Sequence, residues 1–181
     1  MPQSQLTAVI GLGEIGKPLA EMLAKLHVVH GVDLAPVTIE RPVDVMHVCI
    51  PFQLPDFVGV VARYAEMYRP GLIIVNSTVV PGTSRAIAAR VPALVAYSPV
   101  RGKHVKMNAD MALYRKFVAG VTPPATERAA AHFEAVGIAT DRMATADTLE
   151  LAKLTETSYF GVLIAWAHQV MSPPPPRDWP A

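Results

Sequence analysis

The sequence has little of what several classes of protein require. It has a single cysteine, Cys49, which excludes an intrachain disulfide and a multi-cysteine metal site and fits a reducing compartment. Only 17% of the 181 residues are charged and the formal net charge is +1, which argues against a broad basic surface for nucleic acid. A signal-like start and an uninterrupted apolar run of about 18 residues are also missing. We therefore expect a cytoplasmic protein with no nucleic-acid, membrane or metal partner.

Hydrophobic residues, by contrast, make up 51% of the chain, enough for a large core. Short apolar runs alternate with segments in which apolar residues recur at helical spacing. This alternation predicts an α/β fold, namely a Rossmann-type doubly wound parallel sheet followed by a long C-terminal helix. We expect strands over 6–10, 28–32, 43–50, 72–75, 93–97, 117–119 and 138–140, and helices over 14–26, 55–68, 83–89 and 123–136.

The sequence divides into three parts. Residues 1–146 make up the α/β domain, 147–171 read as one long helix, and the proline-rich stretch 172–181 reads as a flexible tail. Apolar residues lie far around the long helix, at Leu149, Ala152, Leu154, Val162, Leu163, Ala165 and Trp166. Because such a helix is usually buried on several sides, the pattern predicts that it pairs with its twin in a homodimer.

A glycine-rich turn follows the first expected strand. It consists of Gly11, Leu12, Gly13, Glu14, Ile15 and Gly16. In a G-x-G-x-x-G turn the first glycine permits the tight bend, the second lets the backbone approach a pyrophosphate, and the third lets the helix pack on the sheet. The N–H groups at the helix N-terminus then attract phosphate. This turn is the predicted dinucleotide site.

An acidic residue stands where the bound nucleotide would present its ribose. Asp33 follows Gly11 by 22 residues, at the end of the second expected strand. Its carboxylate can accept hydrogen bonds from ribose hydroxyls and would repel a 2′-phosphate, which favours NAD over NADP. The alternative is a glycine turn and a surface aspartate that hold no ligand.

Two later strands end in further candidates at the same edge of the sheet. Pro51 follows the strand that contains Cys49, and Ser77 and Thr78 follow the strand over 72–75. We expect Pro51, Ser77 and Thr78 to contact the cofactor, because ligands bind at the carboxyl ends of parallel strands. Helix capping and turn formation are the alternative for the hydroxyls, and the interpretation we prefer for Thr83. For Cys49 we favour a small buried residue over a nucleophile.

The long helix and one loop carry the candidates for chemistry. Lys153 and Thr157 lie on one helix face, and a lysine in a dry pocket can serve as a general acid or base. A solvated face with ion pairs within the helix is the alternative. Arg101, Lys103 and His104 lie in a basic loop suited to a substrate phosphate or carboxylate, although they could equally be solvated loop charges.

Taken together, these motifs resemble the UDP-glucose/GDP-mannose dehydrogenase family. The matching segments are the turn 11–16, Ser77-Thr78-Val79-Val80-Pro81-Gly82-Thr83, Tyr97-Ser98-Pro99, Phe117-Val118-Ala119-Gly120 and the stretch 150–159 of the long helix. The resemblance implies an NAD-binding domain, a central helix that forms a dimer interface, and oxidation of a nucleotide-sugar alcohol to a carboxylate. It also implies a catalytic lysine at Lys153 and a catalytic threonine at Thr78.

The sequence departs from the family in three respects. Thr157 stands where the family has asparagine, and Val100 stands where it has glutamate. The family's C-terminal substrate domain and catalytic cysteine have no counterpart in the sequence. We therefore expect an NAD-dependent oxidoreductase acting on a CH–OH group of a sugar-like or small hydroxylated substrate, with Lys153, Thr78 and Thr157 as catalytic candidates. The alternative is a dimeric NAD-binding module that does not catalyse alone, either a sensor or a partner subunit.

Overall fold

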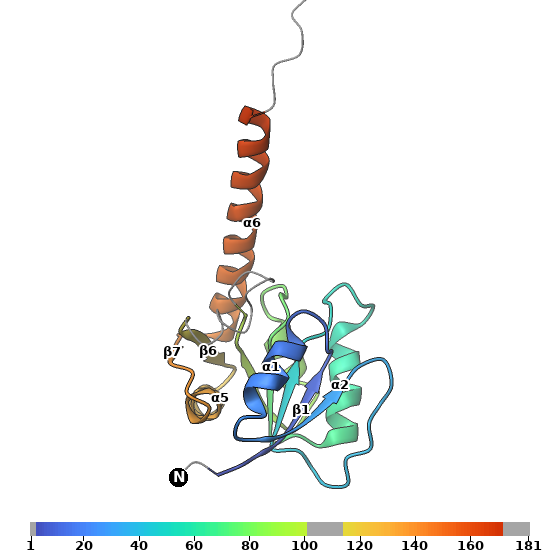
Figure 1. Ribbon diagram of the computed structural model, residues 1–181. Coiled ribbons are helices and arrows are strands. Elements are labelled where there is room, and N and C mark those ends of the chain that lie inside the picture. Colours follow the sequence, from blue (N-terminus) through green and yellow to red (C-terminus); the bar gives the residue numbers. More distant parts are fainter. Residues whose placement is uncertain (1–2, 101–113, 172–181) are drawn as a thin grey trace, which may run out of the picture.

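The computed structural model describes residues 3–100 and 114–171. Within these residues a seven-stranded sheet has the order β2-β1-β3-β4-β5-β6-β7 (Figure 1). The strands are β1 (Leu6–Ile10), β2 (Val28–Val32), β3 (Val45–Val48), β4 (Leu72–Val75), β5 (Leu94–Tyr97), β6 (Lys116–Gly120) and β7 (Thr140–Arg142). The helices are α1 (Gly16–Leu23), α2 (Phe57–Tyr68), α3 (Thr83–Ala88), α5 (Pro123–Ala135) and α6 (Ala146–Met171). The predicted Rossmann-type α/β fold is confirmed, and most element bounds differ from the prediction by only a few residues.

The order of the strands creates a crevice beside β1. This strand pairs with β2 on one side and with β3 on the other, and both pairs are parallel. The chain therefore changes direction across the sheet between β1 and β3, and ligands of such folds bind outside the carboxyl ends of the strands at this point. All five residues of β1 are buried, as expected for a strand covered on both faces.

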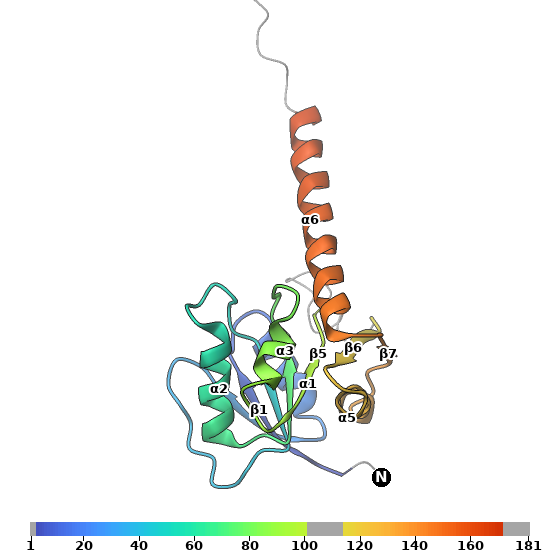
Figure 2. The same ribbon diagram turned by 180° about the vertical axis from the view of Figure 1, so that it is seen from behind.

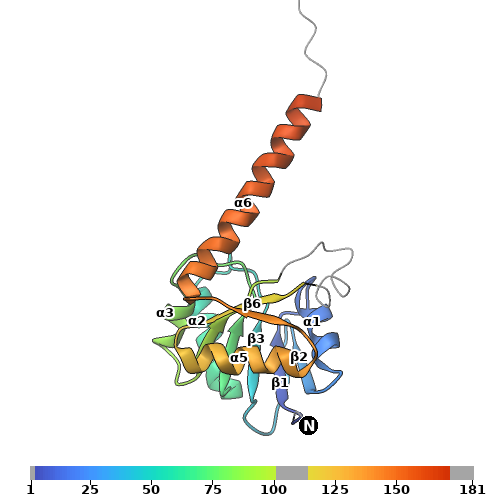
Figure 3. The ribbon, with the colours of Figure 1, turned by 90° about the vertical axis from the view of Figure 1, so that its left-hand side faces the viewer.

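Helices cover both faces of the sheet. On one face, Leu19 of α1 and Phe133 of α5 belong to one apolar cluster, and Figure 3 shows α5 lying across the strands. On the other face, Val61 of α2, Ile87 of α3 and Leu149 of α6 belong to a second cluster. Successive residues of each strand contribute to opposite clusters, because strand side chains alternate between faces. The sheet therefore separates two apolar cores, one on each of its faces.

The sheet is mostly parallel, with one exception. β6 runs antiparallel to β5, with Ala96 opposite Gly120 and Tyr97 opposite Ala119. β7 then pairs with β6 in parallel. The apolar run that predicts β6 contains no information on its direction, so the sequence pattern could not reveal this reversal.

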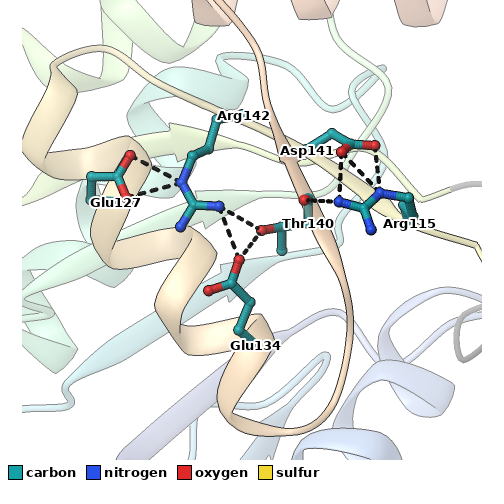
Figure 4. A network of polar contacts seen from close by, with 6 residues as sticks. All are labelled: Arg115, Glu127, Glu134, Thr140, Asp141 and Arg142. Atoms are coloured by element: carbon teal, nitrogen blue, oxygen red, sulfur yellow. Dashed lines mark hydrogen bonds and ion pairs between the residues drawn. The ribbon is translucent and has the colours of Figure 1, made fainter.

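Ion pairs tie the β7 edge to its neighbours (Figure 4). Arg142 pairs with Glu127 at 2.9 Å and with Glu134 at 3.0 Å, both on α5. Arg115 pairs with Asp141 at 2.7 Å. These side chains are well exposed, so each pair contributes at most about 1 kcal/mol. They help to fix the edge strand, whereas the two apolar clusters stabilise the fold.

The helix α6 leaves the body of the protein after its first turns. Its buried residues are Ala146, Leu149 and Glu150, and Figures 1 and 2 show the rest of the helix projecting away from the sheet. Large apolar side chains remain exposed along it, at Leu151, Tyr159, Phe160, Val162, Leu163, Ile164, Trp166, Val170 and Met171. Among the residues described, no helix is long and apolar enough to cross a membrane.

Candidate functional site

The glycine turn lies at the carboxyl end of β1, in the crevice of the sheet. Gly11 has φ +89° and donates its backbone N–H to Val32 O at 2.7 Å, which joins the turn to the end of β2. A Cβ atom at this position would lie 2.8 Å from Cys49 O. Gly11 therefore has to be glycine for two reasons, its left-handed backbone and its close approach to the β3 end.

The other two glycines of the turn have opposite surroundings. A Cβ at Gly16 would lie 1.7 Å from Gly11 O, so the helix α1 can start here only without a side chain. A Cβ at Gly13 would meet nothing within 4 Å, and this residue is exposed. Among the described residues no side chain caps the N-terminus of α1 at Ile15. The turn thus presents open backbone and a helix N-terminus, which fits the pyrophosphate of a dinucleotide.

The remaining cofactor candidates surround this turn. Leu12 packs against Gly31 of β2, where a Cβ would lie 2.8 Å from its side chain. Glu14 is exposed within the turn itself, and Asp33 is exposed directly after β2. Pro51 is exposed beyond the end of β3. Asp33 and Pro51 therefore lie beyond the carboxyl ends of the two strands that flank β1.

The segment after β4 has two hydroxyls with different surroundings. Ser77 Oγ donates to Ile50 O at 2.6 Å, so this side chain joins the loops that follow β3 and β4. Thr78 is exposed. Further along, Thr83 Oγ1 donates to Val80 O at 2.7 Å, which is the turn-stabilising role expected for it. Thr78 is therefore the hydroxyl of this segment that faces solvent at the edge of the sheet.

The lone cysteine, Cys49, is half-buried and directly follows the strand β3. Burial raises the pKa of Cys49 to about 12, so its thiol is protonated at neutral pH. Its Sγ lies 3.9 Å from Asn76 Oδ1, and its Cβ would contact any side chain placed at Gly16. These contacts agree with the structural role favoured for Cys49.

On α6, Lys153 lies one turn beyond the attachment of the helix. Its side chain is 18% exposed and its Nζ lies 3.2 Å from Glu156 Oε2, an ion pair within the helix. Thr157 is exposed and its Oγ1 donates to Lys153 O at 2.9 Å. The ion pair matches the alternative that the sequence left open for this face, although Lys153 is more buried than an ordinary surface lysine.

A buried lysine that sequence reasoning missed lies close to Lys153. Lys116, the first residue of β6, is 5% exposed, and its Nζ donates to Pro99 O at 3.2 Å and Ser98 O at 3.4 Å. Burial, and to a smaller extent the positive charge of Lys153, lowers the pKa of Lys116 to about 8. Lys116 thus holds the Ser98-Pro99 turn at the carboxyl end of β5.

Sequence reasoning also missed a buried polar chain beneath the site. Asn76 Nδ2 donates to Ser98 O at 2.7 Å, which leaves Asn76 Oδ1 to accept from His47 Nδ1 at 2.9 Å. The other nitrogen of a neutral His47 is then bare and accepts from His132 Nε2, 2.9 Å away. His132 Nδ1 lies 2.6 Å from the side-chain oxygen of Gln5, and a half-turn of that amide presents its nitrogen instead. A series of hydrogen bonds thus runs through the core from the carboxyl end of β4 to the start of β1.

Burial keeps the two histidines in this series of hydrogen bonds, His47 and His132, in their neutral form. Burial lowers the pKa of His47 to about 3 and that of His132 to about 2. His27 stacks on His132 with ring centroids 4.7 Å apart, and burial lowers its pKa as well. The sequence gives one sign of this buried network, because His47 stands inside an otherwise apolar strand. Its partner His132 is 85 residues away, a separation that no sequence motif predicts.

Three predicted substrate contacts, Arg101, Lys103 and His104, lie outside the described residues. Val100, which stands where the resembling family has glutamate, is buried. Within 3–100 and 114–171, no group of three or more histidine, cysteine or acidic side chains could hold a metal ion. A surface cavity of about 470 Å³ at the N-termini of α5 and α6 is lined by none of the predicted site residues.

Several solved structures that are similar to this chain are dehydrogenases. A UDP-D-ManNAc dehydrogenase from Pyrococcus horikoshii is 21% identical with a TM-score of 0.77, over 91% of this chain and 52% of that one. A UDP-glucose dehydrogenase from Pyrobaculum islandicum is 19% identical with a TM-score of 0.73, over 94% and 54%. A 3-hydroxyisobutyrate dehydrogenase from Mycobacterium tuberculosis is 23% identical with a TM-score of 0.68, over 88% and 61%.

These similarities are structural. The sequence matches no family model, and no curated protein matches it. The chain spans roughly half the length of the two nucleotide-sugar dehydrogenases, 52% and 54%. The chain therefore shares its fold with about half of each of these two dehydrogenases, and its glycine turn lies at the switch point of the sheet.

Proposed function

We propose that this chain binds NAD at the glycine turn and takes part in the oxidation of a CH–OH group. The observation that carries the proposal is the contrast within the turn. Gly11 and Gly16 are required by the fold itself, whereas Gly13 has open space where a side chain would be. A glycine that the fold does not need is explained by a ligand that approaches its backbone.

Each part of the cofactor has candidate partners on the chain. The turn 11–16 and the N-terminus of α1 would hold the pyrophosphate, and Asp33 would accept hydrogen bonds from the adenosine ribose. Pro51, Ser77 and Thr78 would line the other half of the crevice. When bound there, NAD supplies a hydride acceptor.

The proton of the oxidised hydroxyl would be taken by Lys153. This lysine is mostly buried, and once its contact with Glu156 is released its Nζ, as the neutral amine, could face a hydroxyl and take its proton. Thr78, exposed at the neighbouring strand end, would help to orient that hydroxyl, and Thr157 lies one turn further along α6. Removal of the hydroxyl proton and transfer of the hydride together leave a carbonyl.

The substrate is proposed to be a nucleotide sugar or a small hydroxy acid. The similar structures include enzymes named for substrates of both kinds. Arg101, Lys103 and His104 stay our sequence-based candidates for binding its phosphate or carboxylate. Both kinds of substrate carry an anionic group and a hydroxyl, so the same residue roles apply to either.

We further propose that the chain forms a homodimer through α6. Most of this helix is exposed although it is rich in large apolar side chains, among them Phe160, Leu163 and Trp166. Contiguous exposed apolar surface of this kind marks an interface, and a second copy presents the same helix in the reverse sense. We also propose a cytoplasmic location, because a single free cysteine fits a reducing compartment.

The cofactor proposal is tested by Gly13→Ala, with Gly161→Ala as the matched control. Neither position has a neighbour within 4 Å of the added methyl group, so both variants should fold with unfolding free energies within about 1 kcal/mol of the wild type. We expect Gly13→Ala to weaken NAD binding at least tenfold in calorimetric titration, and Gly161→Ala to leave it unchanged. Equal affinity in all three proteins would refute the proposed site.

A second candidate function is an NAD-binding module that does not catalyse alone. The ion pair between Lys153 and Glu156 favours it, because a lysine held by a carboxylate is not free to accept a proton. The two candidates differ in one measurement. Purified protein that binds NAD but reduces none of it with a panel of nucleotide sugars and hydroxy acids would favour the module.

A further inference from the structure

One buried carboxylate joins the long helix to the edge of the sheet. Glu150 lies in the second turn of α6 and is fully buried. Its Oε2 accepts from Gly82 N at 2.7 Å and its Oε1 accepts from Ser84 N at 2.9 Å. These N–H groups belong to the start of α3, where the N-cap is Gly82 and has no capping side chain of its own. Glu150 thus caps α3 from a position 66 residues away along the chain.

The two hydrogen bonds of Glu150 fix the orientation of α6 on α3 as well as its distance from α3. Each carboxylate oxygen has its own donor, and the donors are two residues apart on α3, so the contact determines both the position and the orientation of the α6 segment around Glu150. The other buried residues of α6 are Ala146 and Leu149, which lie in the first two turns of the helix together with Glu150. The start of α6 therefore has a single buried polar contact with the body among the described residues.

The two proposed partners in catalysis are attached on either side of this contact. Thr78 lies four residues before Gly82, on the segment that leads into α3. Lys153 lies three residues after Glu150, about 4.5 Å further along the axis of α6. Any shift at the Glu150 contact would therefore change the distance between the lysine and the threonine.

The segment of α6 around Glu150 also packs towards the end of β5, because Leu149 and Tyr97 belong to the same apolar cluster. Tyr97, the last residue of β5, is fully buried, and the negative charge of Glu150 adds to the effect of burial in raising its pKa. Its hydroxyl has no hydrogen-bond partner among the described residues. Glu150 therefore binds the start of α3 by two hydrogen bonds, and its charge also acts on the last residue of β5.

We propose that Glu150 is a positioning residue that sets the geometry of Lys153 relative to Thr78 by capping α3. The proposal rests on the proposed function for its catalytic consequence, but its structural part stands on the two hydrogen bonds alone. The charge is needed as well as the shape. A glutamine of the same length can accept one of the bonds, but its NH₂ group would face the other N–H donor.

The test compares Glu150→Gln with a control on the same two helices. Asp147→Asn removes the ion pair between Asp147 and Arg85, a contact of α6 with α3 whose side chains are 39% and 69% exposed. We expect Glu150→Gln to speed amide hydrogen exchange at Gly82 and Ser84 at least tenfold and to shift the Thr78 amide resonance. Asp147→Asn should leave all three amides unchanged.

Kinetics then separates positioning from a role in stability alone. In Glu150→Gln we expect kcat to fall at least tenfold with unchanged affinity for NAD, because the glycine turn is not part of the contact. Glu150→Asp, which keeps the charge, should recover part of the loss and also serves if the glutamine variant does not fold. Unchanged exchange at Gly82 and Ser84, or a lowered Tm with full kcat, would overturn the proposal. If the wild-type protein has no turnover, the proposed function fails, whereas the exchange measurement still decides whether Glu150 holds α3.

Discussion

Acid should destabilise this protein steeply between pH 6.5 and pH 5, because His47 and His132 are buried in neutral form. Both have folded-state pKa values, about 3 and about 2, far below the 6.5 of an unfolded histidine. The unfolded chain therefore binds protons first as the pH falls, and the free energy of unfolding decreases from pH 6.5 downward. The loss continues until the folded-state pKa values are reached.

The magnitude follows from the two shifts. Each histidine that is charged only in the unfolded state lowers the free energy of unfolding by about 1.4 kcal/mol per pH unit. Because an unfolded histidine is only half protonated at pH 6.5, the loss for His47 and His132 together between pH 6.5 and pH 5 amounts to about 3 kcal/mol. A typical domain has only about 5–15 kcal/mol of stability, so this loss would be easy to detect.

The assay is urea unfolding at several pH values, with the variant His132→Gln. A glutamine NH₂ can still donate to His47 Nε2 but does not titrate, so the dependence on pH should fall to about half, whatever stability the variant loses. Ile73→Val, a core substitution that removes no titratable group, should keep the wild-type dependence. A wild-type and a His132→Gln protein with the same slope, or a folded-state imidazole resonance of His47 that titrates near pH 6.5, would refute the reasoning.

Four further substitutions test other parts of the structure. Lys153→Ala should retain NAD binding in calorimetry and lose turnover, and persisting turnover would exclude its catalytic role. Gly16→Ala places a Cβ 1.7 Å from Gly11 O and should cost about 3 kcal/mol or more in urea unfolding, so a stable variant would mean that the turn is wrongly placed. Lys116→Met removes a buried ammonium group. Burial lowers the pKa of Lys116 to about 8, so the charged form is less favourable in the folded protein than in the unfolded chain. The apolar replacement should therefore raise Tm at pH 7, and a lowered Tm would contradict this. Trp166→Glu, on the exposed part of α6, should turn a dimer into a monomer in light scattering, whereas a monomeric wild type at micromolar concentration would contradict the proposed interface.

The sequence predicted the fold and the glycine turn because both depend on local patterns. The turn 11–16 combines its own spacing with a strand before it and a helix after it, and Asp33 follows at the expected distance. Periodicity also located α6 to within one residue of its start, at Ala146. In each case the residues that carry the information are close together in the chain.

The missed features depend on contacts between distant segments. Lys116 precedes an apolar run and looks like an ordinary flanking charge, yet the fold buries it under the Ser98-Pro99 turn. His132 lies in a helix rich in alanine, and only the packing of α5 on the sheet brings it to His47. The direction of β6 is likewise set by pairing with β5, which no local pattern records.

The attachment of α6 by its first turns also affects how the protein unfolds. Beyond Glu150 most of this helix buries nothing against the sheet, so the body lends it little stability. Because most of the stability of a protein helix comes from packing of its apolar face, this part of α6 depends on the second copy that we propose covers it. Its folded fraction should then rise with protein concentration, while the sheet and its two apolar clusters melt at a temperature that hardly depends on concentration. The chain would thus have two melting transitions, and diluting the protein would separate them.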